Sequence, residues 1–165
     1  MYQSSLWPTE KPALYKLLSI RLQGLIDSVP HRTANLANAS ALLADALTDI
    51  NWAGFYFIEK DRLVLGPFQG KPACVEIAIG KGVCGTAVSK DSVMLVKNVH
   101  EFPGHIACDG ASNSEIVIPI HGKASEDTTR SVIGVLDIDS PTLARFDKED
   151  QEGLLRFVEI LETIF

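Results

Sequence analysis

Residues 51–65, NWAGFYFIEKDRLVL, give the clearest indication of the fold that we predict from the sequence. Its first part, 51–59, is rich in aromatic side chains, and its last part, 63–65, is apolar again. The polar residues 59–62 (EKDR) connect the two parts and suit a turn. Two apolar runs joined by a short polar turn indicate a β-hairpin, in which neighbouring strands run antiparallel.

Four further strands are expected after the hairpin. In 75–79, the apolar residues Val75, Ile77 and Ile79 alternate with Glu76 and Ala78, which is the period of a half-buried strand. Apolar runs of strand length also occupy 93–96, 116–120 and 132–138. The segment 98–114 has no periodicity and is expected to be a long irregular loop, a feature that is usually functional in a compact domain.

Helices are expected at both ends of the chain. Leucines and isoleucines at steps of three and four predict an amphipathic helix over about 11–27, which Pro30 ends. A second helix is expected over 36–47, and a last one follows Asp147, whose carboxylate can cap it. The apolar face expected for this last helix consists of Leu154, Val158, Leu161 and Phe165.

This order of elements predicts an α+β fold. The strands do not alternate regularly with helices, so a doubly wound parallel sheet is disfavoured. We expect a central, mostly antiparallel sheet with the N- and C-terminal helices packed on one face. Neither a repeat nor a linker interrupts 1–165, so a single domain is expected.

Composition excludes several classes of protein. The 165 residues include 15 Lys and Arg against 21 Asp and Glu, giving a net charge of −6 without a basic cluster, which disfavours nucleic acid and anionic membranes as partners. Residues 1–12 lack the basic and apolar regions of a signal peptide, and no apolar run approaches the ~18 residues of a membrane span. We therefore expect a cytoplasmic protein, in which three cysteines serve as thiols rather than as a disulfide scaffold.

Two familiar motifs fit the sequence poorly. Residues 80–85 (GKGVCG) match the G-x-G-x-x-G pattern of dinucleotide sites, but the strand before them carries Glu76 and the helix after them is short. His105 and Cys108 are three residues apart, but Cys74 and Cys84 lack the short spacing of a zinc-ligand pair. The sequence thus predicts neither a nucleotide cofactor nor a metal.

Thiol redox chemistry explains the cysteines better. A single cysteine is more often a small buried apolar residue than a nucleophile. Here, however, Cys74, Cys84 and Cys108 all stand outside the centres of apolar periodic segments, and we expect them in loops. Three loop cysteines in a small domain favour one attacking thiol and one or two resolving thiols.

Acidic and aromatic residues complete the candidate site. Asp137 and Asp139 alternate with Leu136 and Ile138 and share one strand face, while Glu115 starts the strand 116–120. A solvated sheet face is the alternative interpretation; a buried carboxyl would instead have a raised pKa and could donate a proton. Trp52 and Tyr56 also share a strand face, either as core residues or as walls of an apolar slot for a small ligand.

The chain resembles the free methionine-(R)-sulfoxide reductases, a family built on the GAF domain. The motifs that carry the resemblance are NWAGFY (51–56), LGPFQG (65–70), GVCG (82–85), HIAC (105–108), SEIV (114–117) and VLDIDS (135–140). The match runs from about residue 33 to the C-terminus, and ordinary GAF sensor domains lack this set of cysteines and acids. The resemblance implies a central antiparallel sheet and free methionine (R)-sulfoxide as the substrate.

The resemblance also implies roles for individual residues. Cys108 corresponds to the attacking cysteine of the family, and Cys74 and Cys84 correspond to its other two. Glu115 and Asp139 correspond to the acids that hold the sulfoxide oxygen, with Asp137 close by. Trp52 and Tyr56 correspond to the walls of the methyl pocket.

The implied reaction needs no metal or organic cofactor. Cys108 would become a sulfenic acid, Cys74 or Cys84 would condense with it to a disulfide, and thioredoxin or a similar dithiol would reduce that disulfide. The family also implies a homodimer. The competing hypothesis is a GAF sensor domain that binds a small ligand or reads redox state without turnover.

Overall fold

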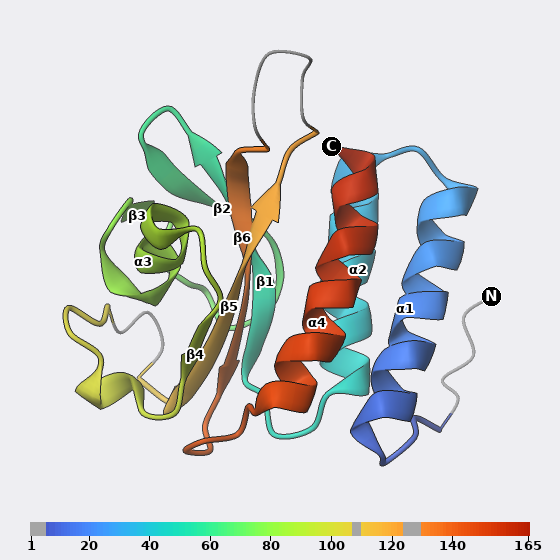
Figure 1. Cartoon of the computed structure of the whole chain (residues 1–165), viewed down its shortest axis with the longest axis horizontal. Helices are drawn as coiled ribbons and strands as arrows, with labels where there is room; N and C mark the ends of the chain where they lie inside the picture. The colour runs from blue at the N-terminus through green and yellow to red at the C-terminus, as the bar shows by residue number, and fades with distance from the viewer. Residues whose placement is uncertain (1–5, 107–109, 124–129) are drawn as a thin grey trace.

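A six-stranded antiparallel sheet organises the protein, as the computed structural model in Figure 1 shows. The structure describes residues 6–106, 110–123 and 130–165. The strands lie in the order β3-β2-β1-β6-β5-β4, and each neighbouring pair is antiparallel. Their bounds are β1 Trp52–Glu59, β2 Arg62–Gly70, β3 Glu76–Ala78, β4 Met94–Val96, β5 Ser114–His121 and β6 Val132–Ser140.

Three long helices cover one face of the sheet. Helices α2 (Arg32–Ala46) and α4 (Lys148–Leu161) lie on the sheet, and α1 (Lys11–Ser28) packs outside them (Figure 1). Helix α3 (Gly82–Lys90) lies on the opposite side of the sheet, together with a long connection that contains the short η1 (Val99–Glu101). The predicted α+β arrangement with the terminal helices on one face is therefore confirmed.

The helix ends lie near the predicted ones, except that α2 begins at Arg32, four residues before the predicted start at 36. Helix α1 ends one residue beyond the predicted Asp27, and α4 begins after Asp147, whose carboxylate accepts hydrogen bonds from the backbone N–H groups of Glu149 and Asp150. Leu154, Val158 and Leu161 are buried as predicted. Phe165 lies beyond α4, after the short η2 (Glu162–Ile164), and packs against the core from its edge. No helix of the described residues has the length and apolar character of a membrane span.

One predicted strand is shorter than expected. Only Ile77 of the three alternating residues is buried; Val75 is 67% exposed and Ile79 is 39% exposed. The reason is that β3 is an edge strand of three residues, paired only with Arg62–Val64, and the chain turns into α3 directly after Ala78. Alternation alone does not reveal where pairing stops.

The two faces of the sheet build separate apolar clusters. Leu136 and Ile138 of β6 pack with the helices α1, α2 and α4, whereas Val135 packs with residues of α3 on the other side. The intervening Asp137 and Asp139 therefore face the α3 side of the sheet. This strict alternation places acidic groups in a cleft between the sheet and α3.

Candidate functional site

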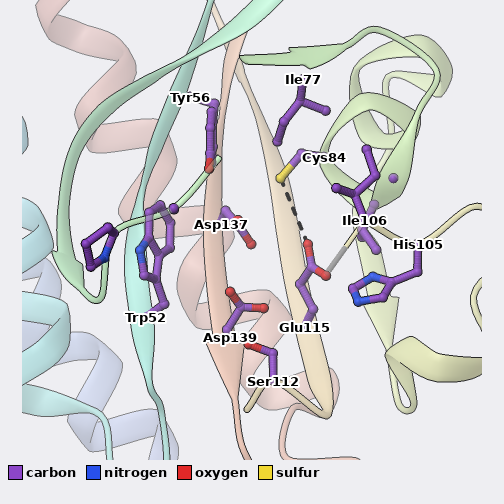
Figure 2. Close-up of a pocket in the computed structure, with 14 residues that line it drawn as sticks. Trp52, Tyr56, Ile77, Cys84, His105, Ile106, Ser112, Glu115, Asp137 and Asp139 are labelled. Atoms are coloured by element: carbon purple, nitrogen blue, oxygen red, sulfur yellow. Dashed lines mark hydrogen bonds between the residues drawn. The ribbon is translucent and has the colours of Figure 1, made fainter. Parts of the chain in front are cut away.

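A pocket between the sheet, α3 and the connection after β4 gathers six of the eight predicted site residues. Figure 2 shows the aromatic side chains on one side, the acids in the middle and α3 on the other side. The described residues that line it are Trp52, Tyr56, Pro72, Ala73, Ile77, Gly82, Val83, Cys84, His105, Ile106, Ser112, Glu115, Asp137 and Asp139. Cys74 adjoins this lining through Ala73, and Cys108 lies outside the described residues.

Strand pairing brings the three acids together. Glu115 of β5 stands directly opposite Asp139 of β6, and the next pair on the same face joins Val117 to Asp137. Glu115 and Asp137 are each only 6% exposed, so the alternative of a solvated sheet face is wrong. Three carboxyl groups thus share a pocket whose described lining contains no lysine or arginine.

Burial changes the acidity of these groups. Removal from water raises the pKa of Glu115 well above its usual range, and the nearby Asp137 and Asp139 raise it further. Burial likewise raises the pKa of Asp137 to about 6, although hydrogen bonds with Cys84 and Glu115 oppose the change. Carboxyl groups in this state can hold a proton near neutral pH and donate it.

The raised pKa of Asp137 predicts a pH-dependent effect on stability. The folded protein favours the protonated form, so stability from this group is complete below the unfolded pKa of 3.8 and is lost as the pH rises through about 6. Asp137→Asn removes that loss. We expect its free energy of unfolding to exceed that of the wild type by about 3 kcal/mol at pH 8, with a much smaller difference at pH 4.

Urea unfolding at the two pH values measures this difference. Asp61→Asn is the matched control, because the Asp61 side chain is 86% exposed and its loss should change stability equally little at both pH values. An Asp137→Asn difference that is the same at pH 4 and pH 8 would contradict the assignment.

Cys84 lies in a helix rather than in the predicted loop. It lies in the first turn of α3, is 3% exposed, and its Sγ is 3.9 Å from Oε1 of Glu115. Burial raises the pKa of its thiol well above the usual range, and the charges of Asp137 and Glu115 add to the effect. Cys84 is therefore a free, protonated thiol in the pocket wall.

The glycines around Cys84 have a packing role. A side chain at Gly85 would place its Cβ 2.4 Å from the carbonyl oxygen of Ala78, and Gly82 has a positive φ of +61°. Gly80 and Gly85 are also joined by a backbone hydrogen bond of 2.8 Å. These contacts form a closely packed turn, because the glycines allow α3 to approach β3.

Cys74 has a different environment. It is half-buried in the loop that follows β2, and it is disulfide-bonded. Its carbonyl oxygen accepts a hydrogen bond of 3.0 Å from the Tyr56 hydroxyl, which ties this loop to the pocket wall. The predicted loop position of Cys74 is confirmed.

The two aromatic residues serve both the core and the pocket. The rings of Trp52 and Tyr56 stack with centroids 5.9 Å apart, and the Phe68 ring also stacks with Trp52, at 5.2 Å. Trp52 donates a hydrogen bond of 3.2 Å to the carbonyl of Lys71. Both rings are more than nine-tenths buried and still line the pocket, so they form a fixed apolar wall.

Other lining residues escaped the sequence analysis. The sequence suggests a role for His105 only as a metal ligand, whereas in the structure His105 lines the pocket and burial lowers its pKa, with a smaller effect from His100. Ser112 and Ile106 also line the pocket. The length of the aperiodic segment 98–114 indicated function, but no periodicity existed to show which side chains point inward.

Comparisons with known proteins agree with this geometry. No protein-family model matches the chain. It is 59% identical over 131 residues, covering 79% of this chain and 76% of the relative, to a protein named free methionine-R-sulfoxide reductase from Escherichia coli (strain K12). The fold is similar to the X-ray structure of free methionine-R-sulfoxide reductase from Neisseria meningitidis in complex with its substrate, with a TM-score of 0.90, 40% identity, and coverage of 100% of this chain and 96% of that one.

A GAF protein of Burkholderia vietnamiensis is also similar. The crystal structure of this putative GAF sensor protein has a TM-score of 0.86 and 51% identity, and the match covers 93% of this chain and 94% of that one. The protein thus has a GAF fold, as predicted from the sequence.

Proposed function

Because the chain belongs to the family of free methionine-(R)-sulfoxide reductases, which are oxidoreductases, we propose that it reduces free L-methionine (R)-sulfoxide to methionine in this pocket. The observation that carries the proposal is the set of three carboxyl groups, two of them buried and that of Asp139 half-buried, opposite a stacked aromatic wall. A sulfoxide presents a polar oxygen and an apolar methyl group on the same sulfur. The pocket offers matching partners for both.

The acids would activate the sulfoxide oxygen. We assign Glu115 and Asp139, which face each other across β5 and β6, to hold this oxygen, with Asp137 beside them. The raised pKa of Glu115 favours a protonated carboxyl that can donate a hydrogen bond and then the proton. Trp52 and Tyr56 would hold the methyl group, since their rings form the apolar wall.

The chemical step belongs to Cys108 in this proposal. Its thiolate attacks the sulfoxide sulfur and forms a sulfur–sulfur bond, and the oxygen takes protons from the acid and leaves as water. Water then attacks the Cys108 sulfur, the sulfur–sulfur bond breaks, methionine leaves with the electron pair of that bond, and Cys108 becomes a sulfenic acid. The cysteine is thereby oxidised by two electrons, which the sulfoxide gains.

We assign the resolving role to Cys74 rather than Cys84. Cys74 is half-buried in a loop and disulfide-bonded, whereas Cys84 is a free and buried thiol whose raised pKa makes it a poor nucleophile. The Cys74 thiol would condense with the Cys108 sulfenic acid, releasing water and forming a disulfide. An external dithiol of the thioredoxin type would then reduce it, in a reducing cytoplasm.

Counting thiols tests this reaction. We expect the fully reduced protein to lose two of its three thiols when free methionine (R)-sulfoxide is added, with one methionine released per chain. Mass-spectrometric mapping is expected to find the disulfide between Cys74 and Cys108 and to find Cys84 unmodified. A disulfide that contains Cys84 would overturn the resolving assignment.

The same measurement separates the enzyme from a GAF sensor. The similarity to the putative sensor protein supports the sensor as the second candidate, and a sensor would bind its ligand without loss of thiols or release of methionine. A homodimer remains a prediction from the family, for which sedimentation of the purified chain is the test.

A further inference from the structure

Three donor atoms converge at the bottom of the pocket from three separate elements. They are Sγ of Cys84 in α3, a carboxylate oxygen of Glu115 in β5 and a carboxylate oxygen of Asp137 in β6, and all lie within 4.8 Å of one another. All three residues are buried. Figure 2 shows their polar ends pointing toward one another. Because two strands and a helix hold them, the donors are brought together by the fold itself.

One oxygen atom of this group of three residues has no partner. Oδ1 of Asp137 is buried and has no hydrogen-bond partner within the described part of the chain, although the residue is only 6% exposed. A buried carboxylate oxygen without a partner is costly, because it has lost its hydration. The hydrogen bonds of Asp137 with Cys84 and Glu115 leave this oxygen without a partner, and the contact of the thiol with Glu115 is long at 3.9 Å. The arrangement is therefore open to a further positive partner.

The donor types select the class of that partner. A thiolate and two carboxylates suit zinc and related borderline cations such as cobalt(II) and cadmium, whereas magnesium and calcium prefer oxygen alone. Zinc bonds of about 2.0–2.3 Å at tetrahedral angles require donors about 3.5 Å apart, so side-chain shifts of about 1 Å suffice. The neutral imidazole of His105 lines the same pocket, and water can also supply a fourth ligand.

We propose that Cys84, Glu115 and Asp137 form a binding site for a zinc-like divalent cation. Binding displaces the thiol proton and any carboxyl protons into solvent, and the cation takes their place. The described lining of the pocket contains no lysine or arginine that would compete with it. The site stands on these contacts alone and does not depend on the proposed reductase reaction.

A cation bound at this site has a consequence for the proposed sulfoxide reduction. A cation on Glu115 and Asp137 removes the protonated carboxyl groups that the sulfoxide oxygen needs. Cation binding and sulfoxide reduction therefore exclude each other, a statement that rests on the proposed function.

Cobalt(II) titration of the oxidised full-length chain tests the site. In that form Cys74 is disulfide-bonded and Cys84 is a free thiol, so the reactive cysteines do not compete for metal. We expect a thiolate-to-cobalt charge-transfer absorption that saturates at one equivalent, disappears when zinc is added, and persists in excess magnesium. Free-thiol counting before the titration verifies the oxidation state.

Variants locate the ligands. Cys84→Ser should abolish the charge-transfer band, and Glu115→Gln and Asp137→Asn should each weaken cobalt binding about 100-fold or more, since even outer partners of a metal contribute 10–100-fold. Glu76→Gln, at an exposed carboxylate on β3, should bind as the wild type does. Circular dichroism identifies any of the three ligand variants that fails to fold. The two variants that do fold then test the site.

Several results would overturn the site. Cobalt binding without a charge-transfer band excludes Cys84 as a ligand, and displacement by magnesium excludes a thiolate site. Wild-type affinity in a folded Glu115→Gln or Asp137→Asn variant excludes that carboxylate. Sulfoxide reduction is measured without added metal, so its failure or success is independent of each of these outcomes.

Discussion

Cys108→Ser is expected to lower methionine formation from free methionine (R)-sulfoxide at least about 1,000-fold, because the serine hydroxyl is not ionised near neutral pH and is a far weaker nucleophile than a thiolate. Release of methionine with thioredoxin or dithiothreitol as the reductant measures the effect. Since the attack precedes every other step, no reductant should restore the activity. The variant should also release no methionine in a single turnover.

Cys74→Ser is the matched comparison. It lacks the proposed resolving thiol but keeps the attacking one, so it should release about one methionine per chain and then stop when thioredoxin is the reductant. A Cys108→Ser variant that releases a full equivalent of methionine would show that another group attacks the sulfoxide. Equal first turnovers in both variants would likewise remove the distinction between attacking and resolving cysteines.

Glu115→Gln is expected to lower kcat about 100- to 1,000-fold. The amide can still contact the sulfoxide oxygen, but it cannot give that oxygen a proton, and general acid catalysis and charge stabilisation each contribute effects of this size. The loss should fall mainly on kcat rather than on KM, because protonation matters most as the sulfur–oxygen bond breaks. Steady-state kinetics with free methionine (R)-sulfoxide measures both constants.

The pH profile adds a readout that a structural defect would not reproduce. Burial raises the pKa of Glu115, so wild-type activity should persist to higher pH than an exposed glutamic acid would allow, and then fall as this group ionises. The fall at high pH should be absent or displaced in Glu115→Gln. Glu76→Gln, whose carboxylate is exposed on β3, should retain both the wild-type rate and the wild-type profile. An unchanged profile in Glu115→Gln would assign the proton to another acid.

Local sequence patterns predicted the main elements because the contacts that form these elements join residues close together in the sequence. The hairpin of β1 and β2, the Asp147 cap of α4 and the shared face of Asp137 and Asp139 all depend on neighbours within a few residues. Each of these features is present in the structure. A sequence pattern of a few residues is therefore sufficient to predict a feature whose contacts lie within those residues.

Features that depend on distant contacts escaped prediction. The burial of Cys84 results from α3 packing on β5 and β6, which lie 30 or more residues later in the chain. The exposure of Val75 depends on how far β3 pairs with β2. The direct opposition of Glu115 and Asp139 depends on the register of β5 and β6, which the sequence of either strand alone does not define.

The alternation along β6 has a consequence for altering this protein. Leu136 and Ile138 belong to the cluster that holds the long helices, whereas Asp137 and Asp139 belong to the pocket. Residues that line the pocket and residues that hold the helices therefore alternate along one strand. A library that varies only 137 and 139 changes the pocket while the helix-facing cluster keeps its packing, and a library at 136 and 138 changes that packing while the pocket keeps its side chains.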